Sequence, residues 1–179
     1  VCSSDLENAS ELAKRWLNKA LYNGLAMFQG NLRNIYIDEG DFENARRVAR
    51  TAANLGNPAM MLYTGLDCHE NGNFEDAFTW FTKAAALGQS ESIAELADYY
   101  YHFYDAKELR STIPYDPVKA IGLYRRAATK NFSDAGYTAL QAAFGYIFHI
   151  GHLPLDWGLI ADLTHMAATK ERFMFALPY

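Results

Sequence analysis

The stretch WFTKAAALG, residues 80 to 88, joins two bulky aromatic residues, three consecutive alanines and a terminal glycine. Ala77 and Ala84 are seven residues apart and so share one face of a helix. Small side chains on that face let a neighbouring helix approach closely, while Trp80 and Phe81 fill the wider gaps beside them. Glycine just past a helix end supplies the left-handed conformation that closes it. The stretch therefore predicts a helix end in a closely packed helical protein.

Glycines recur at a fixed interval that ends in this stretch. They stand at 24, 40, 56, 72 and 88, each 16 residues after the last. Sixteen residues hold a helix of about twelve residues plus a short turn, so each interval predicts one helix. No strand is expected anywhere. The predicted helices span 4–22, 25–38, 41–55, 58–71, 74–87, 90–104, 116–130, 133–149 and 156–169.

Alanines show that the repeating unit is a pair of helices. They recur every 32 residues in two series, at 13, 45 and 77 and at 20, 52 and 84. A step of 43 residues then extends the two series to Ala120 and Ala127, and AKELRSTIPYDP supplies the extra residues as a longer loop. A further step of 40 residues leads from Ala127 to Ala167. Repeats of this period predict a solenoid, in which each unit buries its apolar face against its neighbours.

The predicted architecture is one all-α repeat domain over residues 1–179 with about four and a half helix-pair repeats. The half repeat covers 4–24 and the pairs cover 25–56, 57–88, 89–131 and 132–170, followed by an apolar tail at 171–179.

Composition and charge exclude several classes of protein. The chain has 179 residues, of which 50% are hydrophobic and 21% charged, and its net charge is -5. Such a chain is globular and buries enough surface to fold without a metal or a disulfide. Its basic residues are scattered, the densest group being Arg46, Arg47 and Arg50, so nucleic acid is not an expected partner. The longest nearly uncharged run contains Asp134 and two histidines, so no membrane insertion is expected.

Two groups of residues raise the question of chemistry. The run DCHE at residues 67–70 holds a thiol, an imidazole and two carboxylates, but adjacent residues do not face each other on a helix. Cys68 also stands 32 residues from both Tyr36 and Tyr100, which indicates a structural position. The histidines at 149, 152 and 165 lack a carboxylate or cysteine at ligand spacing. We therefore expect no catalytic residue, no metal site and no cofactor.

The densest aromatic cluster is DYYYHFY, Asp98 to Tyr104. One helical stripe cannot bury six consecutive large side chains, so either the following insertion folds over them or they line a groove. Tyrosines in a groove would offer apolar faces with polar tips to a bound peptide. The candidate partner-binding residues are Tyr36, Glu95, Tyr99, His102, Tyr137 and Gln141.

The tail RFMFALPY, residues 172 to 179, is too apolar to remain loose in water. It is expected to cap the last helix pair. Alternatively it binds a partner or the groove of a second copy, in which case Phe173, Phe175 and Tyr179 would mediate self-association.

These patterns resemble the Sel-one-like repeat, which is related to the tetratricopeptide repeat. The resemblance is carried by AFTWFTKAAALGQSESIAELADYY and DPVKAIGLYRRAAT, while NLRNIYIDEGDFENARRVARTAANLGNP leans towards the tetratricopeptide form. The resemblance covers nearly the whole chain and implies antiparallel helix pairs stacked into a right-handed superhelix. The concave side of such a superhelix often holds a peptide or partner protein.

The expected function is accordingly a protein–protein interaction scaffold that binds a protein or peptide on its concave face, without catalysis. One alternative is a secreted hydrolase or beta-lactam-binding protein like the cysteine-rich members of the family, although their paired cysteines are absent here. Another is a structural module of a larger chain, which a start on the second helix of a unit favours. The compartment is not fixed by the sequence; the resemblance suggests the bacterial periplasm, secretion or the secretory pathway.

Overall fold

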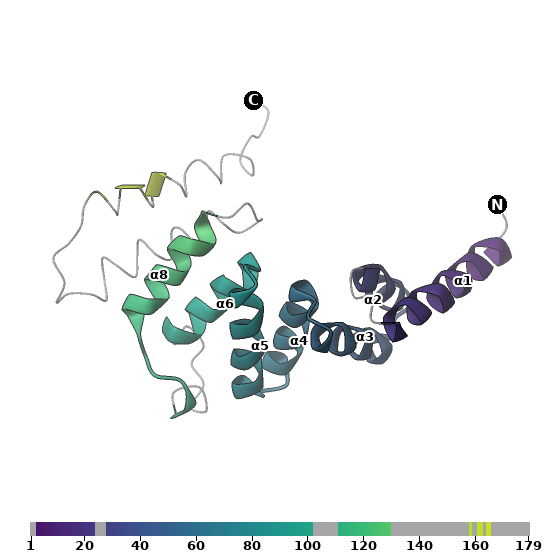
Figure 1. Cartoon of the computed structure of the whole chain (residues 1–179), viewed down its shortest axis with the longest axis horizontal. Coiled ribbons are helices and arrows are strands. Elements are labelled where there is room, and N and C mark those ends of the chain that lie inside the picture. The colour runs from purple at the N-terminus through teal and green to yellow at the C-terminus, as the bar shows by residue number, and fades with distance from the viewer. Residues whose placement is uncertain are drawn as a thin grey trace. The chain divides into compact units, whose positions relative to one another are not determined.

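The computed structural model describes residues 3–23, 28–101 and 111–129, together with 158, 161–162 and 164–165. The elements of regular structure among these residues are helices (Figure 1). Among the described residues this confirms the predicted all-α fold. The helices are α1 (Ser3–Tyr22), α2 (Gln29–Asp38), α3 (Phe42–Asn54), α4 (Pro58–Glu70), α5 (Phe74–Ala86), α6 (Ser90–Tyr101) and α8 (Pro117–Ala128).

The helix bounds differ little from those predicted where they are described. The largest difference is at α2, which begins at Gln29 and not at 25, because Phe28 occupies the N-cap position with φ of -98° and ψ of 7°. Helix α8 begins one residue after the predicted 116, because Asp116 is its N-cap: the Asp116 side chain accepts a hydrogen bond from the Lys119 amide at 2.9 Å, and Pro117 is the first helical residue. The predicted helix 133–149 lies outside the described residues, as do nine of the fourteen residues of the predicted helix 156–169.

Four of the five turn glycines have the predicted conformation, and Gly24 lies outside the described residues. Gly40, Gly56, Gly72 and Gly88 have φ of 76°, 94°, 76° and 85°. Each stands one residue beyond a helix C-cap, and residues around it close the helix by donating back to its last carbonyls. In one example the amide of Asn73 donates to the carbonyl oxygen of Cys68 at 2.8 Å. The 16-residue interval therefore corresponds to one helix and one left-handed turn.

The chain divides into two compact units, Val1–Leu87 and Gly88–Tyr179. In the first unit, each of α1 to α4 packs on the next helix in the sequence, and α2 also contacts α4. In the second unit α6 packs on α8. The division into four and a half repeats stays a prediction, because several of the predicted repeats include residues outside the described ranges.

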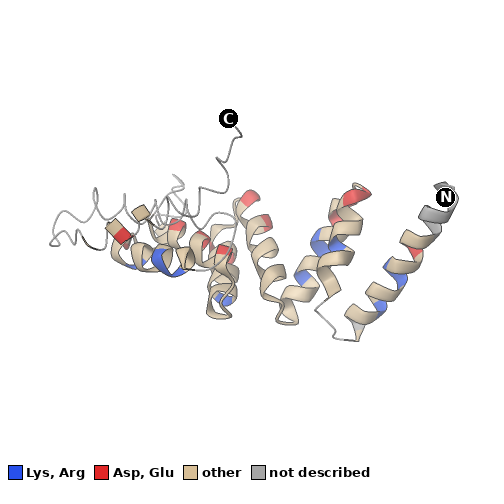
Figure 2. Cartoon of the chain, turned by 90° about the horizontal axis from the view of Figure 1, so that it is seen from above, with Lys and Arg blue, Asp and Glu red and all other residues tan. Residues whose placement is uncertain are grey.

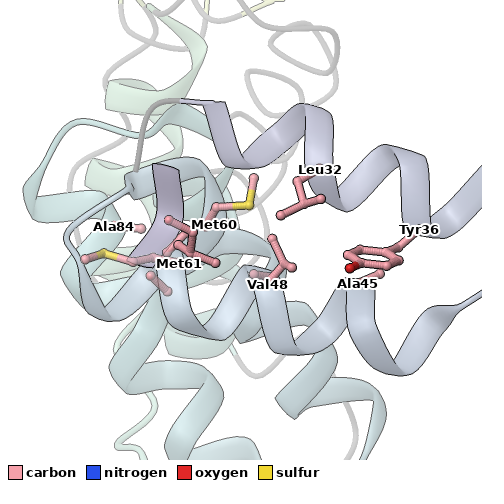
Figure 3. Packing of buried hydrophobic residues seen from close by; sticks show 11 residues of the cluster. Leu32, Tyr36, Ala45, Val48, Met60, Met61 and Ala84 are labelled. Carbon is pink, nitrogen blue, oxygen red and sulfur yellow. The ribbon is translucent and has the colours of Figure 1, made fainter. Parts of the chain in front are cut away.

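The core of the first unit lies between α2, α3 and α4. Leu32 and Val48 have no exposed surface, and Met60 is almost fully buried. Figure 3 shows Leu32 and Tyr36 of α2 pointing toward Val48 and Ala45 of α3, with Met60 and Met61 completing the cluster. The small side chains of α3 let α2 and α4 pack closely on either side of it.

The stretch WFTKAAALG packs as its small residues predict. Ala77, Phe81 and Ala84 of α5 have no exposed surface. A Cβ added at Gly65 of α4 would lie only 2.6 Å from Cε1 and 2.8 Å from Cδ1 of Phe81. The ring of Phe81 therefore lies directly against the backbone of α4, and a glycine is required at the point of contact.

No helix in the described part of the chain is both long and apolar enough to cross a membrane.

Candidate functional site

A groove of about 700 Å³ opens on the first unit, where α2, α3 and α4 meet. Its lining includes Ala45, Ala49 and Thr64, which are buried residues with small side chains. Short side chains at these positions form the floor of the groove, and larger side chains around them form its sides. Those larger residues are Arg33, Ile37, Phe42, Glu43, Arg46, Arg47, Arg50, Tyr63, Leu66, Asp67 and Glu70.

Two aromatic side chains line the groove in partly exposed positions. Phe42 is 58% exposed and Tyr63 is 37% exposed. The guanidinium carbon of Arg33 lies 3.7 Å from the centre of the Tyr63 ring, which is a close cation–π stack between α2 and α4. Large apolar side chains that keep exposed surface beside a groove are characteristic of binding surfaces.

Three further arginines reach the groove from α3. Arg46 and Arg50 are four residues apart and Arg47 and Arg50 are three apart, so they occupy neighbouring positions on the helix surface. Arg46 Nε lies 3.6 Å from Asp67 Oδ1, and Arg47 Nε donates to Asn44 Oδ1 at 3.0 Å. Figure 2 marks the basic residues of the chain in blue and the acidic ones in red.

The sequence pattern did not predict this groove. The three arginines stood out only as the densest group among basic residues that are otherwise scattered along the chain. The spacing of these arginines could have indicated the groove, because ARRVAR places them next to the small residues Ala45 and Ala49 on consecutive turns of one helix.

A second hollow of about 480 Å³ lies between α1 and α2 and includes Tyr36. The Tyr36 hydroxyl accepts a hydrogen bond from Asn18 Nδ2 at 3.2 Å. Lys14 Nζ lies 2.5 Å from Glu11 Oε1 and 2.8 Å from Glu39 Oε2, and hydrogen bonds to these two carboxylates raise the pKa of the lysine. The same lysine lowers the pKa of Glu39. The charges beside Tyr36 are therefore paired with each other.

Three of the six predicted binding residues lie in the described ranges. Tyr36 is buried, Glu95 on α6 is half-buried, and Tyr99 has no exposed surface. None of these three lines the groove on α2, α3 and α4. His102, Tyr137 and Gln141 lie outside the described residues. Partner binding by the six stays a prediction.

The aromatic cluster of α6 is partly covered by the end of the insertion. Tyr100 is buried, and its carbonyl oxygen accepts a hydrogen bond from the Asp116 amide at 2.9 Å. The rings of Tyr101 and Tyr115 lie 6.2 Å apart. The end of the insertion thus returns to the end of α6, as the first of the two interpretations of this cluster expects.

The thiol and the imidazole of the DCHE run are used for packing. Cys68 is buried, and burial raises the pKa of its thiol, an effect that nearby Arg50 partly offsets. A thiol with a raised pKa stays protonated and is a poor nucleophile. The ring of His69 packs edge-on against Phe74 at 5.2 Å, and burial lowers the pKa of the histidine. Tyr36, Cys68 and Tyr100, which share one repeat position, are all buried.

Within the described ranges, no three His, Cys, Asp or Glu side chains are grouped so that they could hold a metal ion. His149 and His152 lie outside those ranges, as do the tail residues Phe173, Phe175 and Tyr179.

One carboxyl in the second unit has a strongly shifted pKa. Burial raises the pKa of Asp98 to about 7, and the charge of Glu95 adds to the shift. The hydroxyl of Tyr124 on α8 donates a hydrogen bond to Asp98 Oδ1, which opposes the shift. This contact joins α6 to α8.

Comparisons with known proteins agree with this fold. The model of the Sel1 repeat family matches residues 6–25, 49–89 and 90–132, which is more than half of the chain. No curated protein matches. Among solved structures, a Sel1 repeat protein from Oxalobacter formigenes is similar with a TM-score of 0.71 and 23% identity, over 89% of this chain and 65% of that one.

A second solved structure is c5321, a protective antigen present in uropathogenic Escherichia coli strains that displays an SLR fold. It is similar with a TM-score of 0.59 and 18% identity, over 88% of this chain. The present chain spans less than two thirds of the first relative and 41% of the second. These two likenesses show a helical-repeat solenoid fold. Because the family model matches over more than half of its length, the chain belongs to the Sel1 repeat family.

Proposed function

We propose that the chain is a protein-interaction scaffold that binds a segment of a partner protein and does no chemistry itself. Membership of the Sel1 repeat family supports a scaffold role. The observation that carries the proposal is the groove on α2, α3 and α4, with its buried small residues and its exposed aromatic walls.

We assign the partner to this groove in preference to the six residues predicted from the sequence. Tyr36 and Tyr99 are buried and offer a partner little contact area, whereas Phe42 and Tyr63 keep exposed apolar surface beside an open space. Exposed aromatic side chains at a groove contribute most to the binding of an extended peptide. We also propose that this groove belongs to the concave face of the repeat.

The test is a selection of peptides from a display library on the purified chain. The selected peptides are then measured against the double variant Phe42→Ala/Tyr63→Ala and against the control Leu87→Ala/Tyr115→Ala, which also removes two exposed apolar side chains. We expect about tenfold weaker binding to the groove variant and unchanged binding to the control. Circular dichroism checks that both variants keep their helices.

Equal binding to the two variants would show that the partner does not use this groove. A selection that yields no binding peptide would contradict the scaffold proposal itself.

A further inference from the structure

We propose that the groove on α2, α3 and α4 selects acidic segments, in which a carboxylate side chain bound by Arg47 and Arg50 lies next to an apolar side chain bound at Phe42 and Tyr63. The inference rests on the proposed function and names the chemistry of its partner.

The lining of the groove carries one more positive charge than negative charge, with four arginines against three carboxylates. These arginines belong to a chain whose net charge is -5. Of these four arginines, only Arg46 has a carboxylate of a described residue within 4.0 Å, the Asp67 side chain at 3.6 Å. Arg33, Arg47 and Arg50 thus bring three positive charges to the groove that form no ion pair with a described residue. A carboxylate from another molecule would complete these pairs.

The guanidinium groups of Arg47 and Arg50 are held in place by contacts with neighbouring side chains. Arg47 Nε donates to Asn44 Oδ1 at 3.0 Å, and Asn44 Nδ2 donates in turn to Asp41 Oδ2 at 2.7 Å. Arg50 Nη2 lies 3.8 Å from Cys68 Sγ, which is a weak acceptor. Both side chains therefore keep N–H groups for a stronger acceptor. A guanidinium that is already oriented loses less entropy when it binds a carboxylate through two hydrogen bonds.

The acidic side chains in the groove disfavour ligands with a high density of negative charge. Glu43, Asp67 and Glu70 line it together with the arginines. These carboxylates repel a ligand that carries a dense row of negative charges, such as a nucleic-acid backbone. A segment in which single acidic residues alternate with apolar ones avoids that repulsion and also fills the space beside the aromatic rings. The mixed lining therefore favours an acidic peptide over a polyanion.

The experiment compares two fluorescein-labelled peptides by fluorescence anisotropy. In one peptide Glu alternates with Leu, and in the other Gln replaces each Glu. The proteins are the unmodified chain, the variant Arg47→Gln/Arg50→Gln, and the control Arg125→Gln/Arg126→Gln. The control removes the same charge from exposed positions on α8, so any general effect of net charge appears in both variants.

We expect the unmodified chain and the α8 control to bind the Glu peptide about tenfold more tightly than the Gln peptide, as charge-assisted hydrogen bonds predict. The groove variant is expected to bind both peptides equally. Raising the salt concentration from about 50 to about 300 mM should weaken the preference for Glu in the first two proteins and have no such effect on the third.

Equal affinity of the unmodified chain for the two peptides would overturn the acidic preference. The scaffold proposal would still stand after that result if the variant Phe42→Ala/Tyr63→Ala bound both peptides more weakly than the unmodified chain does. Equal loss in the two arginine variants would also overturn the inference, because it would trace the preference to net charge. If neither peptide binds, the groove fails as a peptide site and the acidic preference fails with it.

Discussion

At Gly72 the backbone has φ of 76°, and a Cβ added there would meet no atom within 4 Å. The position is therefore restricted by its backbone conformation alone and not by any neighbouring side chain. An L-residue in this left-handed region places its Cβ close to its own backbone oxygen, which costs about 1–2 kcal/mol. The regular spacing of glycines in the sequence thus has a physical cause at each turn.

Replacing Gly72 with alanine should lower the free energy of unfolding by about 1 kcal/mol. The control is Gly122→Ala in α8, where a Cβ also meets nothing within 4 Å but φ is not positive. That change should raise stability by about 0.5–1 kcal/mol, because alanine restricts the unfolded chain and favours helix. Urea unfolding followed by circular dichroism measures both, and two changes of the same sign would contradict the argument.

The sequence revealed single residues only where a spacing marked them. The turn glycines and the buried alanines repeat at fixed intervals, and their roles were predicted. Asp98 has no counterpart in such a series, so nothing in the sequence indicated that burial beside Tyr124 would shift its pKa. Tyr99 belonged to a cluster that the sequence could assign either to the core or to a groove, and its complete burial depends on tertiary packing.

Between elements, the closest described approach at a glycine is that of α4 to α5. Gly65→Ala would place a Cβ 2.6 Å from Cε1 of Phe81, a ring with no exposed surface and hence no room to move toward solvent. We expect a loss of about 1–3 kcal/mol in the free energy of unfolding. The double variant Gly65→Ala/Phe81→Leu should lose less free energy of unfolding than the two single variants lose together. The leucine side chain is smaller than the Phe81 ring and makes room for the new methyl group.

A double-mutant cycle from denaturant unfolding measures this coupling. Additive losses would show that the cost of Gly65→Ala does not arise from its contact with the Phe81 ring.

The stability of the contact between α6 and α8 should depend on pH, because Asp98 ionises within it. Its pKa is about 7 in the folded chain against an ordinary value of 3.8, so folding disfavours the ionised carboxyl. The folded state is therefore most favoured by this group below about pH 4, and that contribution is lost as pH rises from about 4 to 7. The difference amounts to roughly 2–4 kcal/mol.

Asp98→Asn keeps an oxygen acceptor for the Tyr124 hydroxyl and removes the charge. It should raise stability at pH 8 and change it little at pH 4, which thermal unfolding at the two values measures. Tyr124→Phe should raise the pKa of Asp98 further, because it removes the hydrogen bond that favours the ionised form. A carboxyl titration by NMR that gives Asp98 an ordinary pKa would contradict both expectations.

The sequence predicted the bounds of the helices well, but it did not predict the groove. The predicted 58–71 became Pro58–Glu70 because Asn71 takes the C-cap position, and the other short differences have similar causes. The groove requires Arg33, Arg46 and Tyr63, which come from three helices. Their meeting depends on how α2, α3 and α4 pack, and a one-dimensional repeat pattern does not give that packing.

For the molecule as a whole, the repeat period carried the prediction of the fold. Equal intervals between turns imply similar units, and similar units bury their apolar faces only by stacking in order. The prediction of function came from the resemblance and not from the period, since a repeat scaffold supports many different partners.

Helices that pack on their neighbours in the sequence also determine how the protein can fold. In the first unit, α1 with α2, α2 with α3, α3 with α4 and α4 with α5 are each joined by a short connection. Little chain entropy is lost in closing such connections, and proteins with mostly local contacts fold fast. Each hairpin can form as soon as its second helix has been synthesised, so the order of folding can follow the order of translation.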